Sequence, residues 1–147
     1  MEAEGRPYCT IVDAPLDVAA LVDAVRSDAA GALVTFVGTV RESGDDGRAV
    51  SGLDYEAHHE LALRELRAVA GEASSRFGAA RVAIAHRIGS LALGEAAVAV
   101  VVASAHRGVA FDVCEFAIDE LKRRVPIWKK EHYRDGDARW RENAPPG

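Results

Sequence analysis

Hydrophobic side chains recur every three or four residues in three segments of the chain, a spacing that predicts three amphipathic helices. The first predicted helix runs from Asp13 to Ser27, with Asp13 as its N-cap. The second runs from about His58 to Phe77. The third runs from about Arg107 to Arg124 and cannot continue past Pro126, because a proline ring blocks the helical hydrogen bond.

Four other segments carry the β-branched residues or the alternation typical of strands: Ala32–Val40, Val50–Tyr55, Arg81–Ile88 and Ala96–Ala103. The turn-forming residues Gly44–Gly47 separate the first two, so we expect these strands to form a hairpin. The strands come in pairs between helices rather than alternating singly with them. This order favours an α+β domain with a mixed, mainly antiparallel sheet over a doubly wound fold.

The length of 147 residues predicts a single domain with one core, spanning residues 1–147. After Pro126 the chain is expected to be extended. Residues 134–147 are rich in charge, glycine and proline, and only Trp140 could anchor them. We therefore expect a mobile tail there unless a partner orders it.

Composition narrows the class of protein. The formal net charge is −5, which argues against nucleic-acid binding because phosphate neutralisation needs a basic domain. The longest apolar run, Ala96–Ala103, is far shorter than the roughly 20 residues that cross a membrane. The first residues, Met1–Gly5, are acidic where a secretory leader would be basic and then apolar, so we expect a cytoplasmic protein.

One segment departs from this acidic background. Residues 121–130 hold five basic side chains and no acidic one. A run of charge is usually a solvated face. Here Pro126 and Trp128 interrupt the run, and such a pair can fix Lys129 against a pocket wall. In the alternative interpretation, Trp128 fills the core and the lysines point to water.

A second cationic motif, Ser104-Ala105-His106-Arg107, stands where the last predicted strand passes into the third helix. A helix N-terminus offers free N–H groups and a positive dipole to an anion, and His106 and Arg107 would reinforce it. Equally, Ser104 could be a simple helix cap, with His106 and Arg107 in solvent. Arg41, which follows a predicted strand, is a weaker candidate.

The histidines and cysteines do not suggest a metal or thiol site. His86 shares the alternation of its strand, which is typical of a hydrogen-bonded core residue. His58 and His59 are adjacent, so their side chains diverge. Cys9 and Cys114 form no CxxC pair, and Cys114 lies on the apolar stripe of a helix, where burial makes a thiol inert. We therefore expect neither a metal nor a cofactor.

Several short motifs follow one another along the chain. The two most specific are SAHR at Ser104–Arg107 and PIWKKE at Pro126–Glu131. The others are Phe36–Arg41, Leu53–His58, His86–Gly89, Gly94–Glu95, Ala110–Phe111 and Ile118–Lys122. In this order they resemble the large, catalytic subunit of molybdopterin synthase, the MoaE family, from about Gly31 to Trp140.

The resemblance implies an α/β-hammerhead-type fold and a sulfurtransferase of molybdenum cofactor biosynthesis. In this family a small ubiquitin-like sulfur-carrier subunit (MoaD-like) ends in a Gly-Gly thiocarboxylate. The carrier donates sulfur to cyclic pyranopterin monophosphate, and two transfers form the dithiolene of molybdopterin. The resemblance further implies a central homodimer with one carrier on each protomer, which makes a heterotetramer.

The resemblance also assigns site residues. Lys122 and Lys129 match the catalytic lysines of the family, and both are expected to bind substrate. The other matching positions bind substrate or anions or line the same site: Thr39, Val40, Arg41, His106, Arg107, Lys130 and Glu131. Thr39 stands where some members have lysine, so only a backbone contact is expected there.

These assignments agree with the charge pattern, because substrate phosphate and carrier thiocarboxylate are both anions whose repulsion positive groups must offset. We expect Lys129 and Arg41 to hold the pterin and its phosphate, and Lys122 to neutralise the thiocarboxylate and assist proton transfer. The start of the third helix and the segment beyond its end would then meet in one cavity. The alternative is a non-catalytic module that binds an anion or a partner's C-terminal tail in the same pocket.

Overall fold

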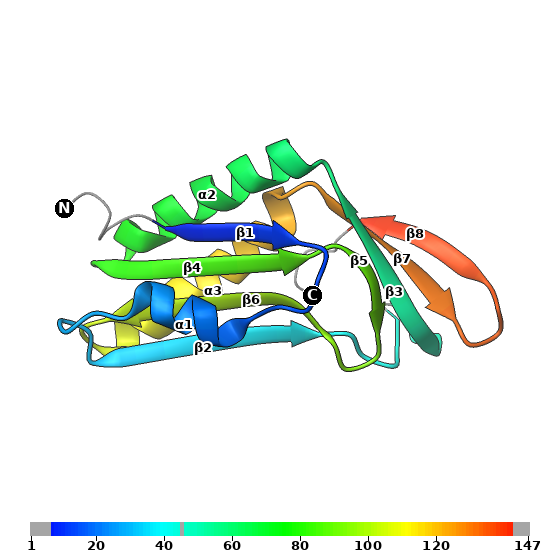
Figure 1. The fold of residues 1–147 in the computed structure, drawn as a ribbon, viewed down its shortest axis with the longest axis horizontal. Coiled ribbons are helices and arrows are strands. Elements are labelled where there is room, and N and C mark those ends of the chain that lie inside the picture. Colours follow the sequence, from blue (N-terminus) through cyan, green and yellow to red (C-terminus); the bar gives the residue numbers. More distant parts are fainter. Residues whose placement is uncertain (1–6, 45, 143–147) are drawn as a thin grey trace.

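The computed structural model describes residues 7–44 and 46–142 (Figure 1). Within them the helices are α1 (Val18–Val25), α2 (His59–Arg76) and α3 (Arg107–Arg124). The strands are β1 (Tyr8–Val12), β2 (Ala32–Thr39), β3 (Val50–Ala57), β4 (Ala80–Arg87), β5 (Gly89–Ala92), β6 (Ala96–Ser104), β7 (Ile127–Tyr133) and β8 (Ala138–Glu142). The acidic start of the chain and Asp45 of the predicted turn lie outside the described residues.

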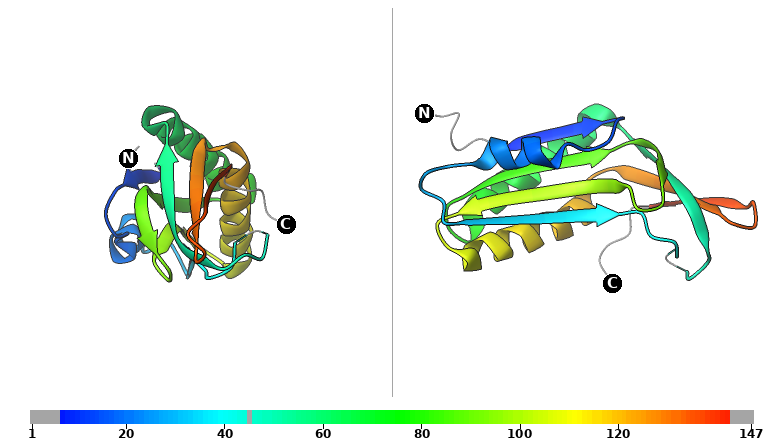
Figure 2. Two further views of the ribbon diagram at one scale, coloured as in Figure 1. Left: turned by 90° about the vertical axis from the view of Figure 1, so that its right-hand side faces the viewer. Right: turned by 60° about the horizontal axis from the view of Figure 1, so that its bottom comes forward.

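These strands form two sheets. The first has the order β1-β4-β6-β2 and is mixed, because β1 runs parallel to β4 while the other neighbours are antiparallel. The second has the order β5-β3-β7-β8 and is antiparallel throughout. Helices α2 and α3 cover one face of the first sheet and α1 covers the other (Figure 2). The predicted α+β class with three main helices is confirmed.

The central strand β6 explains why one run of the sequence is apolar at every position. Val100 and Val102 belong to the core beneath α2 and α3, whereas Val101 and Ala103 belong to the core beneath α1. A strand that is covered on both faces needs no polar side, so its sequence shows no alternation.

Helix α1 begins later than predicted. Asp17, not Asp13, is its N-cap, and the Asp17 carboxylate accepts a hydrogen bond from the Ala20 N–H at 3.1 Å. Strand β1 pairs with β4 as far as Val12, so the chain must turn after Val12 before a helix can start. Strand β1 was not predicted from the sequence.

The predicted hairpin of β2 and β3 is wrong. β2 pairs with β6 in the first sheet, and β3 pairs with β5 and β7 in the second. Residues 40–49, which we call the crossover loop, therefore carry the chain from one sheet to the other. Turn-forming residues show that the chain bends, but they do not select the strand that becomes the neighbour.

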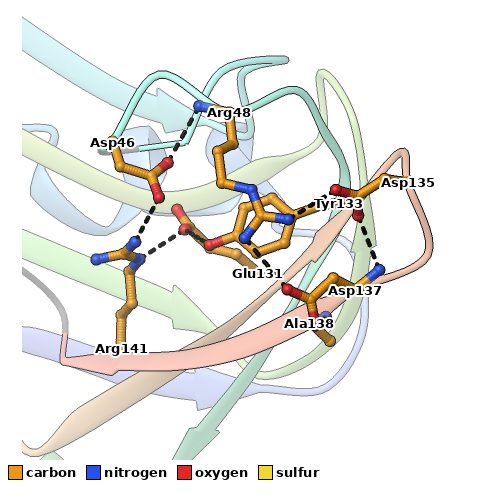
Figure 3. Close-up of polar contacts among 8 residues, drawn as sticks. All are labelled: Asp46, Arg48, Glu131, Tyr133, Asp135, Asp137, Ala138 and Arg141. Atoms are coloured by element: carbon orange, nitrogen blue, oxygen red, sulfur yellow. Dashed lines mark hydrogen bonds and ion pairs between the residues drawn. The ribbon is translucent and has the colours of Figure 1, made fainter.

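Residues 134–142, the described part of the predicted mobile tail, also differ from expectation. Residues 138–142 form β8, which pairs with β7, while Trp140 stays 48% exposed. Charged groups rather than an apolar anchor hold this segment, since Arg48 of the crossover loop pairs with Asp135 at 2.8 Å and Asp137 at 3.3 Å (Figure 3). Residues 143–147 lie outside the described part of the chain.

Candidate active site

The two sheets meet at the end of the first sheet where β2 finishes and β6 starts, and we call this region the junction. Thr39 is the last residue of β2 and pairs with Ala96. The next residue, Val40, is buried; its N–H donates to the Glu95 carbonyl at 3.0 Å and its carbonyl accepts from the Gly94 N–H at 2.7 Å. These contacts fix the start of the crossover loop, which carries Arg41.

Helix α3 brings Lys122 to the same end of the first sheet. Only Ala105 and His106 separate α3 from β6, so the helix doubles back along the strand. The Cys114 thiol in the middle of α3 lies 3.9 Å from the Val100 carbonyl in the middle of β6, as this path requires. The last turn of α3, with Lys122, therefore lies where β6 begins.

His86, near the end of β4, lies within reach of the Lys122 charge. Burial and, secondarily, the positive Lys122 lower the pKa of His86 to about 4, although its hydrogen bond to the Arg87 carbonyl at 2.8 Å acts in the opposite direction. His86 is therefore neutral at pH 7. The prediction of a hydrogen-bonded core histidine is confirmed.

Strand β7 brings Lys129 to this junction from the second sheet. Lys129 pairs with Tyr55 of β3, and directly opposed residues of antiparallel strands point to the same face. The Tyr55 ring meets His86 edge to face, with ring centroids 5.2 Å apart. Lys122, through His86, and Lys129, through Tyr55, thus both neighbour this aromatic pair, although they come from different elements.

Glu131 lies two residues beyond Lys129, on the same face of β7, and is only 2% exposed. Its carboxylate accepts hydrogen bonds from the Tyr133 hydroxyl at 2.7 Å and from Arg141 Nε at 2.8 Å (Figure 3). Burial and the contact with Glu131 raise the pKa of Tyr133. The backbone of Gly44 packs on the same carboxylate, and a Cβ there would lie 3.0 Å from Oε1.

Lys130 lies on the opposite face of β7 from Lys129 and Glu131, because side chains alternate along a strand. Its ammonium group is 5.7 Å from the centre of the exposed Trp140 ring. Trp128 shares this outer face and is 42% exposed, so it is neither a core residue nor a wall for Lys129. The structure does not bring Lys130 together with the other predicted site residues.

His106 and Arg107 lie at the other end of the first sheet. His106 is the N-cap of α3 but makes no side-chain capping bond, and Ser104 donates instead to the Ala79 carbonyl at 3.0 Å, so Ser104 is not the cap. Lys122 lies fifteen positions after Arg107 in the helix, or about 22 Å along its axis at about 1.5 Å per residue. The start of α3 and the segment beyond its end therefore do not meet in one cavity within a single chain, contrary to expectation.

Two surface pockets lie at these same two ends of the first sheet. One of about 180 Å³ lies at the end of α3 and is lined by residues that include Lys122, Pro126 and Trp128. A larger one, of about 400 Å³, lies beside Ser104 and Ala105 at the far end of the sheet.

Neither cysteine is suited to carry reactive sulfur. Burial raises the pKa of Cys9 and of Cys114 to about 11 in both cases, so neither is a thiolate at neutral pH. Within the described ranges no three His, Cys, Asp or Glu side chains gather in a way that could hold a metal ion. In the same residues, no helix has the length and apolar character of a membrane span.

Three residues of the junction were not among the predicted site residues. Tyr55 and His86 belong to the motifs of the resemblance, so a signal for them existed in the sequence. Arg141 had none, because it lies in the segment predicted to be a mobile tail.

Comparison with known proteins gives the family. The family model described as "MoaE protein" matches residues 11–124. The chain belongs to the MoaE family. The match ends at Arg124, so Lys129 and Glu131 lie beyond it.

Individual MoaE relatives extend the similarity. The chain is 48% identical to the molybdopterin synthase catalytic subunit of Oryza sativa subsp. indica over 87% of its own length, and spans 65% of that relative. It is 41% identical to molybdopterin synthase catalytic subunit 1 of Mycobacterium tuberculosis over 97% of both chains. The crystal structure of molybdopterin synthase from Staphylococcus aureus superposes with a TM-score of 0.83 at 34% identity, covering 89% of this chain and 94% of that one.

Proposed function

We propose that this chain is the catalytic subunit of a molybdopterin synthase, a sulfurtransferase that moves sulfur from a carrier thiocarboxylate to cyclic pyranopterin monophosphate. Membership of the MoaE family and the names of its relatives, which are molybdopterin synthase catalytic subunits, support this function. The observation that carries it is the convergence of Lys122 and Lys129 on the His86–Tyr55 pair, beside the start of the crossover loop.

Each positive group has a role in bringing two anions together. Lys129 and Arg41 hold the pterin and its phosphate, and Lys122 neutralises the thiocarboxylate and assists proton transfer during attack by sulfur. Because His86 is neutral at pH 7, it adds an aromatic wall and no further charge. Positive groups fixed in place before the reactants arrive need no reorganisation when charge moves, which is the main source of electrostatic catalysis.

The sulfur comes from a partner. Neither thiol of this chain is ionised at neutral pH, so the reactive sulfur arrives on the C-terminus of a small ubiquitin-like carrier. After sulfur attacks the pterin, hydrolysis breaks the bond between that sulfur and the carrier's carbonyl carbon, so water supplies the oxygen that leaves the carrier tail as an ordinary carboxylate. We also propose a cytoplasmic location, which fractionation of cells expressing the tagged protein would check.

A homodimer completes the site. His106 and Arg107 cannot reach a small molecule held by Lys122 and Lys129 of the same chain, because about 22 Å of helix separates them. A second copy must supply them if all the family positions act on one substrate. We therefore propose that each site takes His106 and Arg107 from the second copy.

Strand β2 offers the surface for this pairing. It is the edge strand of the first sheet and pairs, among the described strands, only with β6. Exposed apolar side chains line it: Leu33 is 46% exposed and Val37 is 38% exposed, and Phe111 of the adjacent α3 is 59% exposed. A groove of about 400 Å³ runs between β2 and α3. Such an edge is a template for another strand.

Antiparallel pairing of β2 with β2 of a second copy would bring the separated halves together. A two-fold axis places the start of one strand against the end of the other. Ala32, at the start of β2, pairs with Ser104 just before His106, and Thr39, at its end, leads to Arg41. His106 and Arg107 of the second copy thus come to lie beside the junction.

A mixing experiment tests the function. The purified protein is combined with a thiocarboxylated carrier and cyclic pyranopterin monophosphate, and mass spectrometry follows the gain of sulfur by the pterin. We expect a product with two added sulfur atoms and a carrier that ends in a carboxylate. Binding of both reactants without transfer would contradict catalysis and favour the anion- or tail-binding module.

A further inference from the structure

Arg141 on β8 bridges two parts of the molecule that carry proposed site residues. Its Nε donates to Glu131 Oε1 at 2.8 Å, and its Nη2 lies 2.9 Å from Asp46 Oδ2 (Figure 3). Glu131 shares a face of β7 with Lys129. Asp46 belongs to the crossover loop, the segment that carries Arg41. One guanidinium group therefore links the strand of Lys129 to the loop of Arg41.

The first half of this bridge neutralises a buried charge. A carboxylate as deeply buried as that of Glu131, which is 2% exposed, is costly without a positive partner. Tyr133 donates a hydrogen bond to it but is neutral. Among the contacts that the structure gives Glu131, Arg141 supplies a full positive charge at 2.8 Å.

The crossover loop rests directly on the Glu131 carboxylate. A Cβ on Gly44 would lie 3.0 Å from Oε1 and 3.1 Å from Oε2, so no larger residue fits here without a shift of the carboxylate. Movement of the Glu131 side chain toward Gly44 would therefore press on this backbone. Arg141 holds the carboxylate from one side and, through Asp46, the loop from the other.

A separate contact keeps the loop attached when Arg141 is changed. The Arg48 guanidinium lies 3.7 Å from the centre of the Tyr133 ring and pairs with Asp135 and Asp137 in the turn between β7 and β8. Loss of Arg141 is therefore expected to shift the loop rather than release it.

We propose that Arg141 is a positioning residue for sulfur transfer, which fixes Arg41 relative to Lys129 by pairing at once with Glu131 and Asp46. This inference rests on the proposed function. The planar guanidinium presents donors in a rigid fork and can hold two carboxylates together, which a lysine ammonium on a flexible stem does less well.

Four variants test it. Arg141→Met removes the charge but keeps the length, and Arg141→Lys restores the charge without the fork. Asp46→Asn weakens only the loop end of the bridge and leaves Glu131 paired. Arg139→Met is the matched control on β8, because the Arg139 side chain is exposed and, within the described residues, makes no side-chain hydrogen bond or ion pair, although Arg139 lies opposite Glu131 in the strand pairing.

Two measurements are made on each variant: steady-state sulfur transfer with the pterin substrate, and hydrogen exchange of the amides in residues 41–49. For Arg141→Met we expect kcat/KM to fall on the order of tenfold to a hundredfold, mainly through a higher KM, because a shift of about 1 Å at a binding group has this effect. Exchange in the loop should be faster. Asp46→Asn should show a smaller effect of the same kind, Arg141→Lys partial recovery, and Arg139→Met the wild-type values.

Wild-type KM and wild-type exchange in Arg141→Met would overturn the inference. A loss of kcat alone, with unchanged KM and loop exchange, would do so as well. If Arg141→Met fails to fold, Asp46→Asn decides by the same two measurements. If the wild-type protein transfers no sulfur, the proposed function has failed, and loop exchange then shows by itself whether Arg141 fixes the crossover loop.

Discussion

The junction between the sheets places two lysines beside a neutral histidine. Lys122 comes from the last turn of α3 and Lys129 from β7, and both lie near the contact of His86 with Tyr55. Tyr55 and His86 come from β3 and β4, far from both lysines in the sequence.

Removal of either lysine should impair sulfur transfer. We expect Lys122→Ala and Lys129→Ala each to lower kcat on the order of a hundredfold, because each removes a preorganised positive group from the reacting anions. Arg123→Ala is the matched control, since Arg123 is exposed in the same helical turn and pairs with Glu120. Mass spectrometry of the pterin and thermal unfolding of each variant would be measured. Full activity in either lysine variant would contradict the assigned roles.

His86 should make the stability of the fold depend on pH. Its pKa is about 4 in the folded chain against 6.5 for the ordinary group, so between these values the unfolded chain binds a proton that the folded chain does not. This contribution to stability is complete above pH 6.5 and is lost as the pH falls toward 4. We expect a loss of about 3 kcal/mol in the free energy of unfolding from this residue.

Urea unfolding at several pH values would check this. The wild-type protein is compared with His86→Gln, which has no titrating group at the position. The difference in unfolding free energy between the two proteins should shrink as the pH falls from 7 to 4.5. A difference that does not vary with pH would contradict a buried neutral histidine.

At the scale of elements, ion pairs between residues far apart in the sequence hold two segments in addition to apolar packing or strand pairing. Arg48 pairs with Asp135 in the turn before β8 at 2.8 Å, and Arg124 at the end of α3 pairs with Glu72 of α2 at 2.8 Å. Periodicity of apolar residues cannot reveal such contacts, because the partners are far apart in the sequence. This is why the tail was predicted to be mobile although its residues 138–142 form a strand.

The N-cap of α1 can be tested by comparing substitutions at Asp17 and Asp13. Asp17 caps the helix, whereas Asp13 lies between β1 and α1. We expect Asp17→Ala to lower the free energy of unfolding by about 1 kcal/mol, since it removes a hydrogen bond to an otherwise unpaired helical N–H. Asp13→Ala should have a much smaller effect in the same denaturation experiment. Equal effects of the two substitutions would contradict the assigned cap.

At the scale of the whole molecule, the fold leaves two groups of cationic residues at opposite ends of one sheet. β2 joins these ends, and its free edge can pair with a second copy. A homodimer would then contain two sites, each with residues from both chains. Whether each site is shared between two chains can be tested without knowing which residues form the interface.

Chains that carry Arg107→Ala and chains that carry Lys129→Ala are each expected to be inactive as homodimers. When the two are mixed and allowed to exchange subunits, a mixed dimer would have one site with both residues intact. Random exchange should restore about a quarter of the wild-type sites. The sulfur-transfer assay and size-exclusion chromatography would be run on the mixture. Activity no higher than that of either parent would show that both residues act within one chain.

The sequence by itself determined the α+β class, the three helices, most of the strands and the burial of His86 and Cys114. These features follow from local periodicity, because a side chain's position within a turn of helix or a pleat depends on its near neighbours. The ordered motifs also carried the family resemblance. Sequence pattern was sufficient to predict a feature wherever the contacts that determine it lie between residues close in the sequence.

The tertiary structure decided what depends on distant partners. It assigned β2 and β3 to different sheets, turned Lys130 and Trp128 away from Lys129, and revealed Arg141 as the partner of the buried Glu131. It also showed that α3 holds Arg107 and Lys122 apart by its own length. Strand pairing and ion pairs across long loops are chosen by the packing of the whole chain, so no stretch of sequence encodes them alone.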